Sequence, residues 1–181
     1  MRFKDVKQEN PKELIMKILD LGCSRNKVKG AVGLDMDPKS DADILCDLTK
    51  RLPIDDNEYD LIYCKHILEH LEKPEDVINL IKEIYRVGKP GSRAIFEVPH
   101  FSNYVAYSDI THRRYFSYFL LENLVKLIPH KSIVKEIRFY KTFRAVGIKA
   151  LANRFVESYE RFWTFIFPAE TIWFEIMLEK K

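Results

Sequence analysis

The stretch that decides the fold is Ile18-Leu-Asp-Leu-Gly22-Cys-Ser24, followed closely by Ala31-Val-Gly-Leu-Asp35. Both runs are apolar on two sides, which is typical of strands at the centre of a parallel sheet. Gly22 allows the backbone to turn sharply, so that its N–H groups can face a ligand. Asp35 closes the second strand, where a carboxylate can accept hydrogen bonds from both hydroxyls of a ribose. The stretch therefore predicts a nucleoside site at the carboxyl ends of two neighbouring strands.

The spacing within this stretch argues against a dinucleotide. A dinucleotide fingerprint needs G-x-G-x-x-G and an acidic residue about 20 positions further on. Here Gly22-Cys-Ser-Arg-Asn-Lys27 lacks the second and third glycines, and only twelve residues separate Gly22 from Asp35. That interval has hardly any room for a crossover helix, whose N-terminus would hold a pyrophosphate. A cofactor with a ribose but no phosphate fits better, and S-adenosylmethionine is the commonest of these. A nicotinamide-binding domain is disfavoured for the same reason.

Size and charge bound the remaining alternatives. The chain has 181 residues with 46% hydrophobic content, which suits one domain spanning 1–181. The net charge of +3 comes from 30 basic and 27 acidic residues, so we expect no nucleic-acid partner. The first residues, Met1-Arg-Phe-Lys-Asp5, contain no apolar leader, and no run approaches the roughly 18 apolar residues of a membrane span. We therefore expect a cytoplasmic protein without a membrane span, with its three cysteines as small buried thiols.

Strand and helix patterns alternate through the first half of the chain, which favours an α/β domain with a parallel sheet. The apolar stripe between Pro74 and Val87 predicts a helix that begins at the proline and is stopped by Gly88 and Pro90. Residues 100–116 have no regular period and predict an irregular loop on the substrate side. Further strands are predicted over 42–48, 59–64, 93–98, 133–141 and 171–179, with helices over 117–127 and 150–167.

Six motifs stand in an order that resembles the class I S-adenosylmethionine-dependent methyltransferases, in the type 11 methyltransferase domain subgroup. The resemblance covers about residues 14–100 and is weak beyond them. The motifs are Asp20-Leu-Gly22-Cys-Ser24 for Asp-x-Gly-x-Gly, Asp35-Met36 for the ribose acid, Asp47-Leu48 on the adenine side, Leu52–Asp60 leading into strand four, Cys64–His70 for the Leu-Glu-His box and Lys89-Pro-Gly-Ser92 for the Lys-Pro-Gly-Gly turn. Serine replaces the second glycine at position 24.

The resemblance implies a single Rossmann-like, doubly wound α/β domain with a seven-stranded sheet. The sheet would be parallel except for an antiparallel last strand, with helices on both faces, a cofactor half at about 14–100 and an acceptor side at about 100–181. It also implies S-adenosylmethionine as the cofactor, held by Asp20, Gly22, Cys23, Ser24, Asp35, Met36, Asp47, Leu48, Lys65 and His66. Two of these have simpler readings, since Asp20 could only orient the glycine turn and Asp47 could only cap a turn.

The loop that follows the fifth strand carries the candidates for the methyl acceptor. Transfer to oxygen or nitrogen needs positioning and a nearby base, and histidine is suited to be that base. We expect His100 and His112 as catalytic residues, with Asp109 as an orienting partner. Tyr104 and the pair Arg113 and Arg114 are expected to bind substrate, the arginines by clamping an anionic group. A solvated surface loop is the competing interpretation.

A divalent metal is a less favoured addition. His66-Ile-Leu-Glu69-His70 matches H-x-x-E-H formally, but it follows a buried strand and precedes Pro74, which argues against a zinc protease. Some class I O-methyltransferases, those of ubiquinone biosynthesis and of small-RNA 2′-O-methylation, are similar in carrying a Glu-His pair after strand four. Glu69, His70 and His100 could converge on one ion, but a second carboxylate is missing, so no metal ligands are assigned.

The function that follows is a methyltransferase acting on a small molecule or glycan, at oxygen or nitrogen, by in-line transfer. The alternative is a non-catalytic partner module that keeps the fold. The aromatic segment 155–167 predicts a cover on the sheet or a homodimer face, with a groove for an apolar or glycosylated acceptor as the second interpretation.

Overall fold

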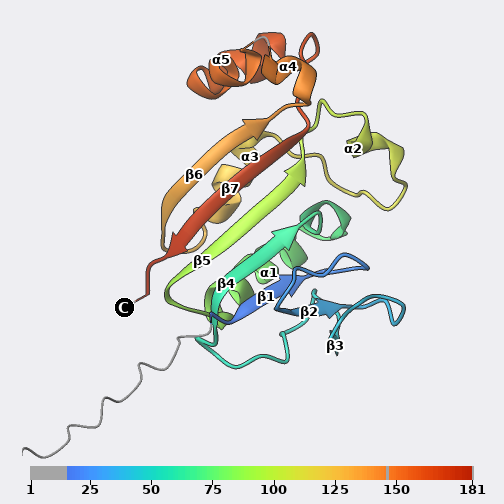
Figure 1. Cartoon of the computed structure of the whole chain (residues 1–181), viewed down its shortest axis with the longest axis vertical. Helices are drawn as coiled ribbons and strands as arrows, with labels where there is room; N and C mark the ends of the chain where they lie inside the picture. The colour runs from blue at the N-terminus through green and yellow to red at the C-terminus, as the bar shows by residue number, and fades with distance from the viewer. Residues whose placement is uncertain (1–15, 146, 181) are drawn as a thin grey trace, which may run out of the picture.

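The computed structural model describes residues 16–145 and 147–180. Residues 14 and 15 of the predicted cofactor half, with the rest of the first fifteen, lie outside the described residues. One seven-stranded sheet runs through the molecule in the order β3-β2-β1-β4-β5-β7-β6 (Figure 1). Its strands are β1 (Ile18–Leu21), β2 (Ala31–Asp35), β3 (Ile44–Leu45), β4 (Tyr59–Lys65), β5 (Gly88–Pro99), β6 (His130–Arg138) and β7 (Thr171–Leu178).

The direction of the strands matches the predicted architecture. β1 to β5 pair in parallel, whereas β7 is antiparallel to both of its neighbours, β5 and β6. The Rossmann-like seven-stranded sheet with a reversed last strand is thereby confirmed. The carboxyl ends of β1, β2 and β4 meet at one edge, which is where open α/β sheets bind ligands.

The helices with eight or more described residues are α1 (Pro74–Val87) and α3 (Tyr118–Val125), and they contact each other on the same face of the sheet (Figure 1). Helices on both faces are the expectation from the resemblance, and here the described residues differ. The connections after β1, β2 and β3 contain turns but no helix. The interval between Gly22 and Asp35 was too short for one, as its length predicts.

Helix α1 forms where its apolar stripe predicts it and supplies much of the core. Val77, Leu80, Ile81 and Ile84 are buried in the same hydrophobic cluster as residues of β4, β5 and β7. Fully burying one such side chain stabilises the fold by about 1.5–3 kcal/mol. Pro74 occupies the first turn, where a missing N–H costs nothing.

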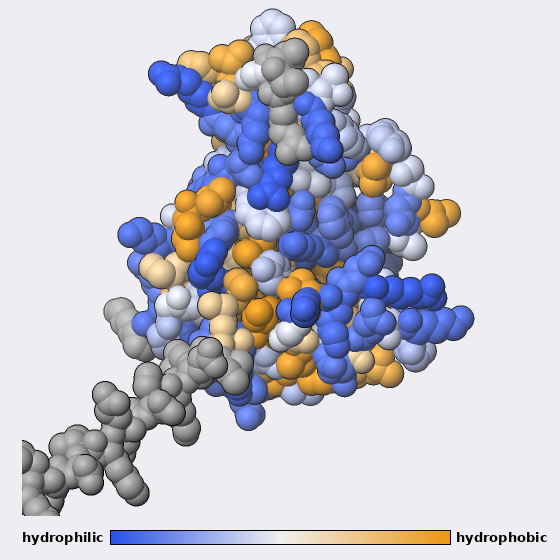
Figure 2. Space-filling view, in the orientation of Figure 1, coloured by the Kyte–Doolittle hydropathy of each residue, from blue (hydrophilic) through white to orange (hydrophobic). Residues whose placement is uncertain are grey.

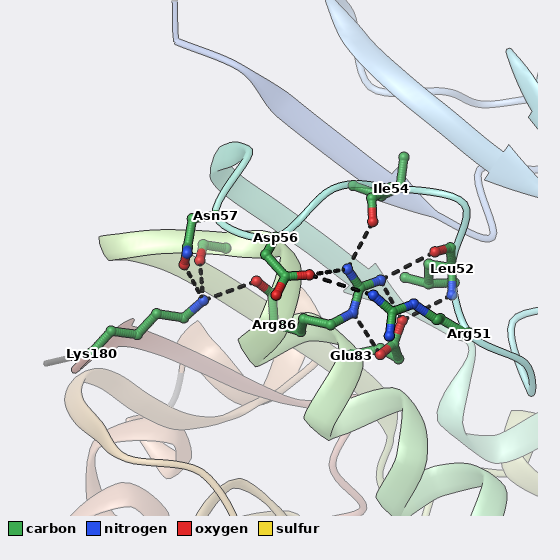
Figure 3. A network of polar contacts seen from close by, with 9 residues as sticks. Arg51, Leu52, Ile54, Asp56, Asn57, Glu83, Arg86 and Lys180 are labelled. Atoms are coloured by element: carbon green, nitrogen blue, oxygen red, sulfur yellow. Dashed lines mark hydrogen bonds and ion pairs between the residues drawn. The ribbon is translucent and has the colours of Figure 1, made fainter.

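Polar contacts tie the segment before β4 to the end of α1 (Figure 3). The Arg86 guanidinium donates to Glu83 and Asp56 and to the backbone carbonyls of Leu52 and Ile54. Glu83 in turn accepts from the N–H of Leu52 at 2.8 Å. The segment has no regular structure of its own, so these bonds fix its path to β4.

The second face of the sheet carries long charged side chains laid over aromatic rings. The Arg138 guanidinium lies 3.7 Å from the centre of the Trp173 ring, and the Lys65 ammonium lies 5.1 Å from the same centre. Beside them, Arg93 forms an ion pair with Glu175. Figure 2 views the molecule from this side, where hydrophilic and hydrophobic side chains are interspersed. Arginine and lysine side chains thus cover aromatic rings on this face of the sheet.

The remaining elements depart from the predicted bounds in places. β3 has two residues rather than the seven predicted, and β6 begins three residues before the predicted 133. The predicted helix 150–167 is broken at Phe155. The short helical elements are η1 (Leu68–His70), α2 (Val105–Ser108), α4 (Lys141–Ala145), α5 (Ile148–Arg154), α6 (Val156–Ser158) and η2 (Tyr159–Trp163). None of the described helices has the length and apolar content needed to cross a membrane.

Candidate cofactor and acceptor site

A cleft of about 610 Å³ opens at the carboxyl ends of β1, β2 and β4. Five of the ten predicted cofactor residues line it: Gly22, Asp35, Met36, Asp47 and Leu48. They come from three different connections of the sheet, so the fold brings together residues that the sequence separates by up to 26 positions. The opposite wall is built by the segment after β4, including Ile67, His70 and Leu71.

Gly22 makes the turn that the sequence predicts. Its φ is +64°, a left-handed conformation that favours glycine, and its N–H donates to the Leu34 carbonyl at 2.7 Å. The Ile67 side chain fills the space where a Cβ would stand. The backbone of β1 therefore passes directly beneath the cleft wall.

Asp35 is available to a ribose even though it already braces the turn. One carboxylate oxygen accepts from the N–H of Ser24 at 2.9 Å and the other from the N–H of Asp37 at 2.9 Å. Each carboxylate oxygen can accept two hydrogen bonds, so each keeps one acceptor position free. The residue is half-buried at the cleft. This geometry fits a nucleoside whose two hydroxyls bond to one carboxylate.

Ser24, at the position of the motif's second glycine, adopts a left-handed backbone conformation. Its φ is +46°, so it adopts the left-handed region without being a glycine. This conformation costs free energy in a serine, and surrounding contacts must stabilise it. The hydrogen bond from the Ser24 N–H to Asp35 is such a contact. Cys23, between the two turn residues, is buried with its sulfur packed against Gly33.

Asp20 and Asp47 both serve local turns in this structure. The Asp20 carboxylate is 5% exposed and accepts from the N–H of Val28 at 2.8 Å, and burial raises its pKa. Asp47 accepts from the N–H and hydroxyl of Thr49, and these bonds lower its pKa. Asp47 still lines the cleft, whereas Asp20 is not part of its lining.

Lys65 and His66 are likewise not part of the cleft lining. Lys65 lies on the second face of the sheet, above Tyr63 and Trp173. His66 is exposed, with φ +54°, and its Nδ1 lies 3.3 Å from Oε1 of Glu69. Glu69 raises the pKa of His66.

The acceptor loop 100–116 is fastened to the cleft wall. The N–H groups of Arg113 and Arg114 both donate to the Glu69 carbonyl, at 2.7 and 3.2 Å. The Arg114 guanidinium also donates to the carbonyls of Leu71 and Glu72. Arg114 is thus occupied with the backbone, whereas Arg113 and Tyr104 are exposed.

The three catalytic candidates separate into two places. His100 is fully buried, with Nδ1 2.8 Å from Ser102 and Nε2 3.2 Å from Glu160. It is therefore closed off from an incoming acceptor. The described residues group Glu69 and His70 with His112, not with His100, which was the third ligand of the disfavoured metal set. His112 does approach them: its ring centre lies 4.7 Å from that of His70. Asp109 accepts from Thr111, which in turn contacts His70.

Sequence reasoning missed most of the wall built by the segment after β4. Thr49, Lys50, Ile67, Leu71, Glu72, Lys73, Asp76 and Thr111 line the cleft without having been candidates. The rule that ligands bind beyond the carboxyl ends of parallel strands would have pointed to residues 67–73, because they follow β4 directly. Thr111 carried no such signal, since only the folding of the acceptor loop brings it to the cleft.

Comparison with known proteins identifies the central part of the chain. Residues 19–96 match the family model described as a methyltransferase domain, of the type 11 methyltransferases. These residues run from β1 into β5 and include the turn at Gly22, Asp35 and the cleft wall after β4. The match covers 78 of the 181 residues, and the rest of the chain lies outside it. The resemblance carried by the six motifs is thus confirmed.

Solved structures share the fold of this chain across nearly its whole length. A SAM-dependent methyltransferase from Archaeoglobus fulgidus is 18% identical, with a TM-score of 0.67 over 90% of this chain and 86% of that one. One from Methanosarcina mazei is 14% identical, with a TM-score of 0.63 over 92% and 93%. The [4+2]-cyclase SpnF is 17% identical, with a TM-score of 0.59 over 92% and 75%. No curated protein sequence matches the chain.

Proposed function

We propose that this methyltransferase domain transfers a methyl group from S-adenosylmethionine to oxygen or nitrogen of a small-molecule or glycan acceptor. The observation that carries the proposal is the cleft at the carboxyl ends of β1, β2 and β4, with Asp35 keeping acceptor positions free on both carboxylate oxygens. Met36, 75% exposed beside Asp35, offers an apolar surface to an adenine. Asp47 and Leu48 lie at the same cleft.

The acceptor is expected to reach the cofactor along the loop 100–116. Thr111 lines the cleft and His112 follows it, so this part of the loop borders the cofactor site. Of the two histidines predicted as bases, His112 retains a ring nitrogen without a hydrogen-bond partner in the described structure, because only its Nδ1 is bonded, to the Ala106 carbonyl at 3.0 Å. In-line transfer then requires the acceptor, the methyl carbon and the sulfur to be aligned by the cleft.

Two finer features belong to the same proposal. We expect the protein to act in the cytoplasm, since Cys23, Cys46 and Cys64 are free thiols, as in a reducing compartment.

We also expect a homodimer or an apolar acceptor at the aromatic segment 155–167. Phe162 and Phe165 are 67% and 80% exposed there, beside a cavity of about 380 Å³ between α5 and η2.

Calorimetry with S-adenosylmethionine and with its demethylated product S-adenosylhomocysteine tests the cofactor. We expect one molecule bound per chain, with binding weakened by Asp35→Ala and unaffected by Asp37→Ala. Absence of binding to both ligands contradicts the proposal. Binding of the cofactor without any turnover, in a screen of hydroxyl and amine acceptors, would favour the non-catalytic partner module instead.

A further inference from the structure

Glu69 is a buried carboxylate without a hydrogen-bond partner in the part of the chain that the structure describes. Its side chain is 1% exposed, and neither of its oxygens has a hydrogen-bond partner among the described residues. The Nδ1 of His66 lies within ion-pair range of Oε1, at 3.3 Å, but without hydrogen-bond geometry. A buried charge left in this state costs several kcal/mol. Such a group points to a cation that completes it.

Two imidazoles stand beside this carboxylate. Glu69, His70 and His112 offer ligand atoms that all lie within 4.8 Å of one another. Ligands about 2.1 Å from an ion lie at most about 4.2 Å apart, so the group needs to contract by roughly half an ångström to hold one. His70 is exposed and His112 half-buried, so their side chains have room for that adjustment.

The contacts behind the two histidines prepare them as ligands. The Nδ1 of His112 is 3.0 Å from the Ala106 carbonyl, to which it can only donate, so its Nε2 keeps a lone pair. The Thr111 hydroxyl donates to Asp109 at 2.6 Å, so it accepts from Nδ1 of His70 at 2.9 Å. Nε2 of His70 then also keeps its lone pair. Hydrogen bonds of this kind orient metal-binding histidines in proteins.

The geometry points to a divalent transition-metal site formed by Glu69, His70 and His112. One carboxylate with two neutral imidazoles suits zinc, iron, cobalt or manganese, and three protein ligands leave positions for water or a substrate oxygen. His70 and Thr111 line the cofactor cleft, so the ion lies beside the place where an acceptor meets the cofactor. A bound ion lowers the pKa of a hydroxyl that coordinates it.

This assignment narrows the acceptor to one with an oxygen able to bind the ion. This conclusion about the acceptor rests on the proposed function, whereas the binding of the ion does not. It also gives His112 a different role, because an imidazole that ligates a metal cannot accept the proton of the acceptor. The hydroxyl made more acidic by the ion loses its proton to water instead.

Titration of the purified, tag-free and metal-free protein with Co²⁺ tests the site through the visible absorption of the bound ion. We expect one Co²⁺ per chain. Glu69→Gln, His70→Ala and His112→Ala are each expected to weaken binding at least about tenfold, since even residues behind the ligands change metal affinity by about 10–100-fold. Glu69→Gln leaves the backbone bonds from Arg113 and Arg114 intact.

His130→Ala is the matched control, because Nδ1 of His130 also contacts a backbone carbonyl, that of Ile128 at 2.9 Å, on a different part of the fold. It is expected to bind Co²⁺ like the parent protein. Circular dichroism of each variant separates loss of the site from loss of the fold. Thr111→Val tests positioning: we expect weaker binding with the absorption bands of the intact ligand set retained.

The inference is overturned if the parent protein binds no stoichiometric Co²⁺ up to millimolar concentration, or if folded His70→Ala and His112→Ala bind it as the parent does. Calorimetry with S-adenosylhomocysteine on the same preparations keeps the two proposals apart. Cofactor binding without Co²⁺ binding removes the metal site alone, and Co²⁺ binding without cofactor binding removes the proposed function alone.

Discussion

The side chain of Ile67 lies over Gly22 so closely that a Cβ built on the glycine falls 1.7 Å from Ile67 Cδ1. Gly22 is the first residue after β1, and Ile67 is the second residue after β4. They are in contact, and no side chain fits at position 22. Since both line the cleft at the carboxyl ends of the strands, this contact sets the distance between its two walls.

Gly22→Ala is expected to destabilise the protein and weaken cofactor binding together. The alanine must keep a φ near +64°, which costs about 1–2 kcal/mol, and must also displace Ile67. Gly30→Ala is the control, because Gly30 has φ +79° with nothing within 4 Å of its Cβ position. Urea denaturation and calorimetry with S-adenosylhomocysteine measure both effects. Equal losses in the two variants would show that the contact with Ile67 has no energetic weight.

Asp35→Ala is expected to weaken binding of S-adenosylhomocysteine by about 10–100-fold, because hydrogen bonds to a charged group contribute about 1.5–3 kcal/mol. The substitution also removes the acceptor for the N–H of Ser24, so the turn itself loosens. Asp37→Ala, which loses only a local bond to Lys39, is expected to bind like the parent. Calorimetry checks this, and an unchanged affinity for Asp35→Ala would remove the ribose assignment.

Glu83 is expected to make stability depend on pH. The Arg86 guanidinium holds the pKa of this carboxyl below its ordinary value of 4.5, so its contribution is present above that pH and is lost as the pH falls through the folded-state pKa. Glu83→Gln should therefore destabilise the protein at pH 7 and much less near pH 3.

Urea denaturation at both pH values measures the difference, with Glu75→Gln as control. Glu75 is exposed on the same helix and accepts none of the bonds in Figure 3. A Glu83→Gln effect of the same size at pH 7 and pH 3 would mean that the ion pair with Arg86 does not stabilise the folded state.

Asn153 closes the outer edge of the sheet. Its side chain accepts from the N–H of Ile137 at 2.7 Å and donates to the Ile137 carbonyl at 2.8 Å, on the side of β6 where no other described strand pairs with it. Asn153→Ala leaves these groups unpaired, which costs about 1–3 kcal/mol, and exposes an edge that can pair with other chains. We expect lower stability and faster aggregation on heating, followed by light scattering. Asn79→Ala, on an exposed part of α1, should show neither effect.

The local parts of the fold were predictable from the sequence because they depend on neighbouring residues. The stripe from Val77 to Ile84 determines α1, and the turn at Gly22 follows from a buried run that ends in glycine. The length of β3 was not predictable: Asp43 bonds to Gly33 and Lys27, and Asp47 turns the chain back on Thr49, so pairing is limited to Ile44 and Leu45.

In the site, too, the residues set by local sequence were predictable and those set by distant contacts were not. Asp35 and Met36 follow from a strand end, whereas the partners of His100 and His112 depend on how the loop closes over the sheet. Nothing in the spacing of residues 100–116 indicates that His100 faces Glu160, sixty positions away, or that backbone bonds to Glu69 bring His112 beside His70.

The two hydrogen bonds that the N–H groups of Arg113 and Arg114 donate to the Glu69 carbonyl have a thermodynamic consequence. These bonds join the loop 100–116, where we propose that the acceptor binds, to the cleft wall after β4, where we propose that the cofactor binds, so we expect the two to shift together. If acceptor binding tightens the cofactor by some factor, the cofactor must tighten the acceptor by the same factor. The order in which the two ligands are added then changes the rate of assembly but not the final occupancy. Any coupling between the two binding free energies would be transmitted through these two backbone hydrogen bonds.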